Sequence, residues 1–303
     1  MEQFYICLEM GGTNLRVGIV NEAFQVLYFK KTPTLALAQA EDKIDFFATL
    51  LQPLVQRACL LGHPRAVCLS LASLMDRNRK VVYSSPMVVG FDNLALADGL
   101  EQRLQMPVVM EKDVNALLMY EVNQNQLPQE GIVMGVFLGT GLGNAICIDG
   151  RVYPGYSGAA CELGHIAIPG LEAECGCGKK GCIELKACGR RLQEIAGVLQ
   201  CPVEELFIQY AQHPLVQEQV NYFAIAIAIE ATLLDPASIL LGGGVIDMKG
   251  FPLEELQNRV LENVRKPYPC QTLTFAKASG NSKAGVVGIA MHAALVLKET
   301  EWD

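Results

Sequence analysis

The sequence predicts an α/β protein made of two related domains. Its 303 residues suit two domains of ordinary size, and a composition of 51% apolar and 18% charged residues can fill large cores. A strand, a glycine–threonine turn and a second strand occur near the start of each half, at residues 4–20 and 132–148. This internal repeat indicates two α/β domains that face one cleft.

In the first half, residues 44–61 carry apolar side chains at helical spacing, which predicts an amphipathic helix packed on a sheet. Another helix is expected at 94–104, after a loop at 86–93. Residues 107–110 are expected to form a strand that delivers 111–115 to the start of a helix reaching about residue 125. Further strands are expected at 4–8, 15–20 and 65–71.

In the second half, a hairpin is followed by a cysteine-rich segment and then by mostly helical sequence. Short apolar runs predict strands at 132–138, 144–148 and 238–241, the last of which ends in three glycines. Helices are expected at 185–199, 203–211, 215–234 and 283–297.

The charge and cysteine content narrow the classes of partner. A net charge of −8 argues against nucleic acid as the main partner. The apolar run at 222–234 is shorter than the ~18–20 residues of a membrane span and contains Glu230, so no membrane partner is expected. Eleven cysteines, mostly scattered singly, fit a reducing compartment, and residues 1–3 resemble no leader, so a cytoplasmic location is expected.

Three glycine-bearing turns follow predicted strands, at 11–13, 139–143 and 242–244. Backbone amides and threonine hydroxyls in the first two can hold phosphates, and the third lets the backbone pass close under a nucleoside. A turn of this kind is also common in a hairpin that binds nothing.

After Cys161, the segment that ends at Glu184 contains one histidine, His165, and three cysteines spaced C-x-C-x4-C: Cys175, Cys177 and Cys182. Thiolates and an imidazole are the ligands of tetrahedral structural zinc, and the intervening glycines let the loop turn back on itself. Disulfides or buried small side chains are the alternatives. Glu162 and Glu184 flank the ligands and are interpreted as free carboxylates that accept hydrogen bonds from a polyol.

Asp113 follows a predicted strand, in the region where open α/β sheets bind ligands. A carboxylate there suits a general base that accepts the proton of an attacking hydroxyl. The alternative is an N-cap of the helix that follows, and both roles can coexist.

Taken together, these motifs resemble the ROK family (repressors, open reading frames, kinases). The family's two phosphate signatures resemble residues 9–16 and 138–143, and its zinc loop resembles 175–184. The resemblance implies the actin-like, ribonuclease-H-like ATPase fold, with two α/β domains around a cleft and a small zinc loop. It implies a first domain of residues 1–112, joined by a C-terminal helix at about 284–303, and a second domain of residues 113–283.

The resemblance also implies an ATP-dependent sugar kinase with magnesium, structural zinc and a homodimeric state. His165 would bind zinc through one ring nitrogen and face the sugar with the other. The residues matching the family's sugar site are Asn93, Lys112, Asp113, Glu162, His165 and Glu184, with Asp113 as the base. Those matching its ATP and magnesium site are Glu9, Gly11, Gly12, Thr13, Asn14, Arg16, Gly139, Thr140, Gly141, Gly242, Gly243 and Gly244.

The chain departs from the family pattern at three places. Glu9 stands where aspartate is usual, Lys112 where glucokinase members have asparagine, and residues 70–73 where a Gly-x-Pro-Gly loop is usual. The last two changes point away from plain glucose. Residues 112–115 and 242–252, with the missing loop, resemble the allose kinases of the family, which implies phosphorylation of the 6-hydroxyl of D-allose.

Three other functions remain open. One is another hexose or N-acetylhexosamine kinase of the same family, acting on glucose or N-acetylmannosamine. A second is a sugar-responsive repressor, although only a few residues precede the first glycine turn, which leaves no room for a helix-turn-helix domain there. The third is a catalytically silent sugar-binding protein, which Glu9 and Lys112 suggest.

Overall fold

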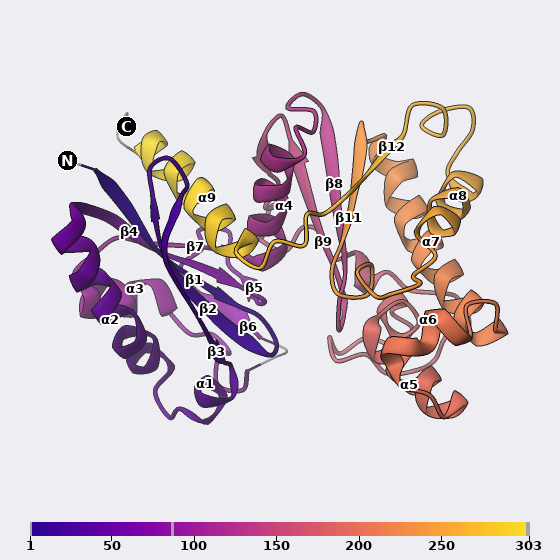
Figure 1. Ribbon diagram of the computed structural model, residues 1–303, viewed down its shortest axis with the longest axis horizontal. Helices are drawn as coiled ribbons and strands as arrows, with labels where there is room; N and C mark the ends of the chain where they lie inside the picture. The colour runs from indigo at the N-terminus through magenta and orange to yellow at the C-terminus, as the bar shows by residue number, and fades with distance from the viewer. Residues whose placement is uncertain (1, 86–87, 301–303) are drawn as a thin grey trace. The chain divides into compact units, whose positions relative to one another are not determined.

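The computed structural model describes residues 2–85 and 88–300 (Figure 1). The chain divides into two compact units. The first comprises Met1–Tyr120, Pro154–Ala160 and Asn281–Asp303, and the second comprises Glu121–Tyr153 and Cys161–Gly280.

These divisions differ from the expected boundary between residues 112 and 113. Helix α4 (Asp113–Gln124) begins in the first unit, and the division follows Tyr120. The segment Pro154–Ala160 also belongs to the first unit, although both of its flanks belong to the second.

A five-stranded mixed sheet forms the centre of the first unit. Its strands are β1 (Gln3–Met10), β2 (Asn14–Asn21), β3 (Val26–Pro33), β4 (His63–Leu71) and β7 (Val108–Lys112). They lie in the order β3-β2-β1-β4-β7, in which β1–β2 and β2–β3 pair antiparallel and β1–β4 and β4–β7 pair parallel. Short strands β5 (Leu74–Met75) and β6 (Val82–Ser84) form a separate ribbon.

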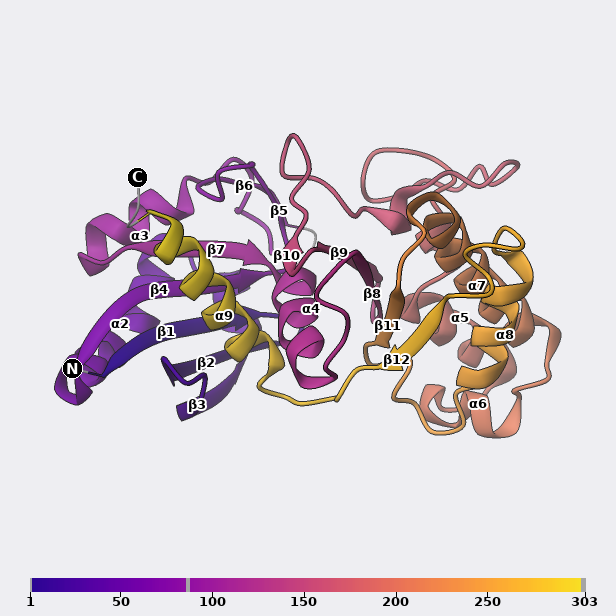
Figure 2. The same cartoon turned by 90° about the horizontal axis from the view of Figure 1, so that it is seen from above.

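Helices cover both faces of this sheet. Phe4, Ile6 and Leu8 of β1 lie in a core with α2 (Lys43–Leu61) and α3 (Leu96–Leu104). Tyr5 and Cys7 lie in a second core with α9 (Ala284–Thr300), which crosses the sheet (Figure 2). Because successive strand residues point to opposite faces, a continuously apolar strand such as β1 requires both layers. The short α1 (Leu35–Gln39) precedes α2.

Helix α2 is long and apolar enough to cross a membrane by length and composition alone. Its apolar residues Phe47, Leu51 and Leu54 are instead buried in the core of the first unit. Helix α2 therefore packs one apolar face on the sheet, as an amphipathic helix does.

The second unit repeats the sheet of the first. Its strands are β8 (Ile132–Leu138), β9 (Leu142–Ile148), β10 (Arg151–Val152), β11 (Ser238–Gly242) and β12 (Thr274–Lys277). They lie in the order β10-β9-β8-β11-β12, with antiparallel pairs β8–β9 and β9–β10 and parallel pairs β8–β11 and β11–β12. Strand order and direction therefore match the first sheet position by position, which confirms the internal repeat and the predicted α/β class.

The remaining elements of the second unit are helical. They are the 3-10 turns η1 (Leu163–His165), η2 (Ile183–Leu185) and η3 (Val203–Glu205), and helices α5 (Gly189–Leu199), α6 (Leu206–Gln209), α7 (Pro214–Leu234) and α8 (Leu253–Asn263). Phe223, Ile227 and Ala231 of α7 lie in the core of this unit together with strand residues of β8 and β11.

The predicted elements agree with the structure where periodicity is long, and differ where it is short. The helix expected at 203–211 is a 3-10 turn followed by four helical residues, and the helix expected from residue 185 begins at Gly189 after η2. The sequence prediction missed strands β3 and β12 and helix α8, and also the short elements α1, β5, β6 and β10. Strand β3 lies at the sheet edge with mixed exposure and two lysines, so it lacks a clear alternating pattern. In the loop expected at 86–93, residues 86 and 87 lie outside the described residues.

Candidate functional site

The four predicted zinc ligands lie together in the second unit. The ligand atoms of His165, Cys175, Cys177 and Cys182 are all within 4.8 Å of one another. Cys177 Sγ is 3.6 Å from Cys182 Sγ, and Cys175 Sγ is 3.6 Å from His165 Nδ1. Zinc–sulfur bonds of about 2.3 Å in a tetrahedron require ligand separations of roughly 3.5–4 Å, so the cluster fits a zinc ion.

Backbone contacts fold the loop around this cluster. The Cys175 amide donates to Lys179 O at 2.7 Å, and the Ile168 amide donates to Gly181 O at 2.7 Å. Gly181 has φ +74°, and a Cβ there would lie 2.4 Å from Leu171 O. Only glycine fits this position, as its place between the cysteines suggests.

The two ring nitrogens of His165 face different groups. Nδ1 faces the cysteine cluster, and Nε2 lies 3.7 Å from Glu162 Oε2. One nitrogen therefore lies on the side of the cysteines, where a metal could bind, and the other lies beside a carboxylate.

Glu184 is not the free carboxylate that the sequence suggested. Its Oε2 accepts from the Leu142 amide at 3.1 Å, and its Oε1 accepts from Arg190 Nη2 at 3.1 Å. A Cβ at Gly141 would lie 2.6 Å from Glu184 Oε2, so the glycine makes room for the carboxylate. Glu184 therefore connects the zinc loop to the second glycine turn.

The second glycine turn is also held by the start of α5. The amide of Gly189 donates to Gly139 O at 2.8 Å, and the amide of Arg190 donates to Thr140 O at 3.3 Å. The Gly139 amide donates to Gly141 O at 3.0 Å. It is therefore hydrogen-bonded within the turn, although the sequence suggested that it is available to a phosphate. A Cβ at Gly139 would meet no atom within 4 Å, so one side of the turn stays open.

The three glycines after β11 have different surroundings. Gly243 has φ +95°, and a Cβ there would lie 2.5–2.8 Å from the backbone of Leu138. A Cβ at Gly242 would lie 2.7 Å from Ala278 Cβ, whereas Gly244 has open space. Glycine at 242 and 243 is thus required by packing within the protein, whereas a side chain at position 244 would meet open space.

In the first unit, the glycine turn between β1 and β2 carries a paired carboxylate. Glu9 is 8% exposed, and its Oε1 accepts from Arg16 Nη1 at 2.5 Å. Burial raises the pKa of Glu9 to about 7; the Arg16 cation opposes this shift and the Asp113 carboxylate adds to it. Glu9, Arg16 and Asp113 are therefore brought together within this unit.

Tertiary packing around Glu9 involves a residue that sequence reasoning missed. A Cβ at Gly285, in the first turn of α9, would lie 2.5 Å from Glu9 Cδ. The turn itself is closed by the Gly11 amide, which donates to Asn14 O at 3.0 Å, and by Thr34 Oγ1, which donates to Gly11 O at 2.9 Å. The sequence suggested that the backbone amides of the glycine turns are available to phosphates. The Gly11 amide, like the Gly139 amide, is instead hydrogen-bonded within its own turn.

Asp113 is the first residue of α4 and directly follows β7, as predicted. Its Oδ1 accepts from the Val114 amide at 2.9 Å. The preceding Lys112 is 8% exposed, and its Nζ donates to Ala160 O at 3.1 Å. Asn93 has φ +56°, and its amide donates to Tyr83 O at 3.2 Å.

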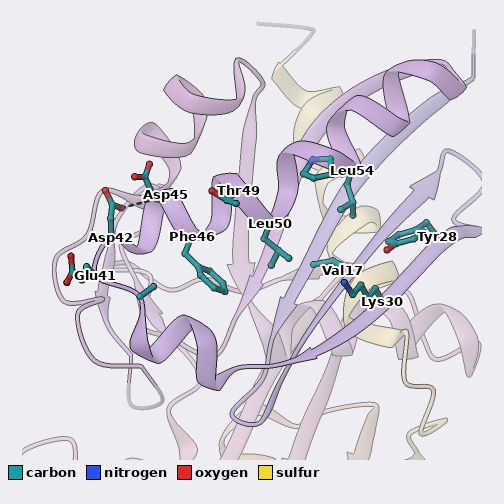
Figure 3. Close-up of a pocket in the computed structure, with 12 residues that line it drawn as sticks. Val17, Tyr28, Lys30, Glu41, Asp42, Asp45, Phe46, Thr49, Leu50 and Leu54 are labelled. Atoms are coloured by element: carbon teal, nitrogen blue, oxygen red, sulfur yellow. Dashed lines mark hydrogen bonds between the residues drawn. The ribbon is translucent and has the colours of Figure 1, made fainter.

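A surface groove of the first unit lies apart from all of these residues (Figure 3). It has a volume of about 730 Å³ and runs between α2 and strands β2 and β3. It is lined by Val17, Tyr28, Lys30, Ala40, Glu41, Asp42, Asp45, Phe46, Thr49, Leu50, Pro53 and Leu54. None of the predicted site residues lines it.

Comparisons with known proteins cover almost the whole chain. Residues 5–298 match the model of the ROK family. A glucokinase of Streptomyces coelicolor is 29% identical over 320 residues, covering 94% of this chain and 96% of that protein. An N-acetyl-D-glucosamine kinase of Photobacterium profundum is 28% identical over 305 residues, covering 94% and 98%. The crystal structure of a ROK family glucokinase from Streptomyces griseus in complex with glucose and AMPPNP is similar with a TM-score of 0.76 at 28% identity, covering 95% of this chain and 98% of that one.

Proposed function

The chain belongs to the ROK family and is an ATP-dependent sugar kinase, and from this premise we propose that it phosphorylates the 6-hydroxyl of a hexose, D-allose in the first instance. The observation that carries the reaction type is Asp113, which stands at the carboxyl end of β7 and at the start of α4 within a unit whose glycine turn holds Glu9 and Arg16.

Asp113 acts as the general base. Its carboxylate takes the proton of the 6-hydroxyl while the sugar oxygen forms a bond to the γ-phosphorus of ATP and the bond from that phosphorus to the ADP oxygen breaks. Positioning and charge stabilisation supply most of the remaining rate, because phosphoryl transfer requires little covalent chemistry from the protein. A bound magnesium ion would neutralise negative charge that develops on the phosphates.

In the first unit, Glu9 suits a magnesium ion; in the second unit, the open glycine turns suit the nucleotide. The ionised Glu9 carboxylate suits a hard divalent cation, and its pKa of about 7 means that a nearby cation shifts it towards the ionised form. The open sides at Gly139 and Gly244 support a place for phosphates and nucleoside near the end of β8.

His165, Cys175, Cys177 and Cys182 would hold a structural zinc ion. That ion would fix η1 and η2, from which Glu162 and Glu184 project. Glu162 and His165 Nε2 are then proposed to accept hydrogen bonds from, or donate them to, the sugar hydroxyls.

The identity of the sugar rests on the departures from the family pattern. Lys112 in place of asparagine and the absent Gly-x-Pro-Gly loop support D-allose over glucose. The names of the relatives favour glucose or an N-acetylhexosamine, so these remain the second candidate acceptors. A cytoplasmic location and a homodimeric state are proposed from the family resemblance.

The test is a panel of sugars with ATP. Purified protein is incubated with D-allose, glucose, N-acetylglucosamine or N-acetylmannosamine, and ADP release and the sugar phosphate are measured. We expect D-allose to have the highest kcat/KM; a higher value for another sugar would reassign the acceptor. No turnover with any sugar would favour a silent sugar-binding protein.

Asp113→Asn is the matched variant for the mechanism. We expect it to lower kcat by about 10²–10⁴-fold, because it removes the proton acceptor while keeping the shape of the side chain. Its melting temperature and its binding of sugar serve as controls. A variant that kept the full rate would overturn the assignment of the base.

A further inference from the structure

Glu111, two residues before the proposed base, is one of the most deeply buried charges of the first unit. It is 2% exposed and lies on β7. Its Oε1 accepts from Arg79 Nε at 2.9 Å, and Arg79 Nη2 lies 2.9 Å from the same oxygen. A carboxylate at this depth requires such a cation, because desolvation disfavours an unpaired charge.

The same carboxylate holds the backbone and side chains on both sides of Asp113. Oε1 also accepts from the Lys112 amide at 2.8 Å and from Asn115 Nδ2 at 3.0 Å. Lys112 is the last residue of β7 and Asn115 lies in the first turn of α4. The side chain of Glu111 therefore bridges the strand-to-helix junction at which Asp113 stands.

Arg79, the partner of Glu111, also binds the segment Pro154–Ala160. Its Nη1 donates to Gly158 O at 3.1 Å and to Asp76 O at 3.0 Å. Gly158 has φ +88°, and a Cβ there would lie 2.6 Å from Met75 O, so the segment packs too closely for any other residue. Lys112 Nζ binds the end of the same segment at Ala160 O.

We propose that Glu111 is a positioning residue for Asp113, and that Arg79 couples this position to the segment Pro154–Ala160. The inference rests on the proposed function of Asp113 as the base. Glu111 acts only through the junction, because its Oε1 is engaged by Arg79, Lys112 and Asn115 and its Oε2 lies 3.6 Å from His292 Nε2. Lys112 contributes to the same coupling, because its Nζ donates to Ala160 O at the end of this segment. This contact is in addition to its expected place near the sugar.

The charged and titratable groups that bear on this junction come from several elements. Arg79 is the cation paired with Glu111, the Lys112 ammonium lies at Ala160 O, and His292 Nε2 on α9 lies 3.6 Å from Glu111 Oε2. Glu9 on β1 interacts electrostatically with Asp113. Replacing Glu111 with a neutral side chain leaves the Arg79 cation uncompensated, which favours the ionised form of Asp113.

The experiment compares Glu111→Gln and Arg79→Lys with Arg77→Lys. Arg77 is the matched control: it is exposed and binds the same segment through Tyr156 O at 3.5 Å. The readouts are kcat and KM for the sugar, the pH profile of kcat, and the melting temperature. The Glu111→Gln profile is repeated in a His292→Gln background, so that titration of the histidine is not mistaken for that of the base.

We expect Glu111→Gln to lower kcat by about 10–100-fold and to move the acid limb of its pH profile to lower pH by roughly half a unit to one unit. Arg79→Lys should lower kcat by about tenfold, because lysine cannot bond Glu111 and Gly158 with the fork geometry of arginine. Arg77→Lys should change kcat less than twofold and leave the profile in place.

A purely structural role would give a different result. Glu111→Gln would then lower only the melting temperature, with kcat per folded molecule and the acid limb both unchanged, and this would overturn the proposal. Equal changes of kcat in Arg79→Lys and Arg77→Lys would overturn the coupling through Arg79. If Glu111→Gln does not fold, the kcat of Arg79→Lys decides whether the proposal holds. If Asp113→Asn keeps the wild-type kcat, the assignment of Asp113 as the base is wrong. If Asp113→Asn loses activity while Glu111→Gln and Arg79→Lys keep the wild-type kcat, the base is supported and the positioning role is wrong.

Discussion

The glycine turns of the two units stand at equivalent places in equivalent sheets, yet they are held in different ways. In the first unit the nearby buried carboxylate, Glu9, comes from the hairpin itself and pairs with Arg16 on the next strand. In the second unit the turn is braced by Glu184, which comes from the zinc loop 42 residues further along the chain.

The strands that follow the turns show the same contrast. The third residue of β2, Arg16, is a cation, whereas the third residue of β9, Asn144, is an amide that donates to Glu230 on α7 at 2.8 Å. The first turn is therefore supported by its own hairpin and by Thr34, 23 residues after Gly11, and the second depends on segments further along the chain. Loss of the zinc loop should accordingly disturb the second turn and leave the first intact.

The largest effect is expected from Cys182→Ser, which removes a proposed zinc ligand. Structural zinc contributes directly to folding, so we expect the second unit to lose roughly 3–5 kcal/mol of unfolding free energy, a fraction of the values for zinc-finger peptides. Metal analysis should find about one zinc ion per chain in the wild type and much less in the variant.

Hydrogen exchange tests whether this loss stays in one unit. The Leu142 amide should lose protection in Cys182→Ser, while the Gly11 amide in the first turn keeps its own. Cys201→Ser, at a cysteine of the same unit outside the cluster, is the control. Equal loss of protection in both turns would show that the first turn also depends on the metal loop.

A smaller effect is expected from Glu230→Gln, which tests a half-buried carboxylate of the second unit. Burial raises the pKa of Glu230 to about 7, and the Asn144 hydrogen bond only partly opposes this. Since the folded pKa is raised, the folded state binds the extra proton, so its contribution to stability is present below about pH 4.5 and is lost as the pH rises through about 7. The variant should gain about 2–3 kcal/mol relative to the wild type at pH 8 and much less at pH 5.

Melting temperatures at pH 5 and pH 8 measure this difference. Glu218→Gln on the same helix is the control, because Glu218 is exposed and only 3.8 Å from Lys186 in a surface pair. A Glu230→Gln advantage that is the same at both pH values would contradict the assignment of the pH dependence to this carboxyl group.

The smallest of the three effects is expected from Gly141→Ala. The added Cβ would meet Glu184 Oε2 at 2.6 Å, so the carboxylate must leave either Leu142 or Arg190. We expect a loss of about 1–2 kcal/mol in unfolding free energy, measured by denaturant titration. Gly139→Ala places its Cβ in open space and should change stability by less than about 0.5 kcal/mol. Equal losses in the two variants would mean that Glu184 does not brace the turn.

Much of the fold could be predicted from local pattern. Long periodic stretches such as 44–61 and 215–234 are helices within two residues of their expected ends, and both hairpins lie where the repeated glycine–threonine turns placed them. Edge strand β3 and short β12 were missed because edge strands face solvent and carry no clear alternation. The helix expected at 203–211 is shorter because a periodic pattern alone does not show where the backbone tightens into a 3-10 turn.

The sequence alone determined the features whose cause is local. The four predicted zinc ligands converge because three of them, the cysteines, lie with turn glycines within a few residues of one another. Asp113 stands at a strand-to-helix junction because the apolar run before it ends there. The tertiary structure decided the partners of the charged groups: Glu184 on Leu142 and Arg190, Glu111 on Arg79, and Glu9 against Gly285. A buried charge takes whichever partner the packing of distant segments brings within reach, and no spacing along the chain encodes that choice.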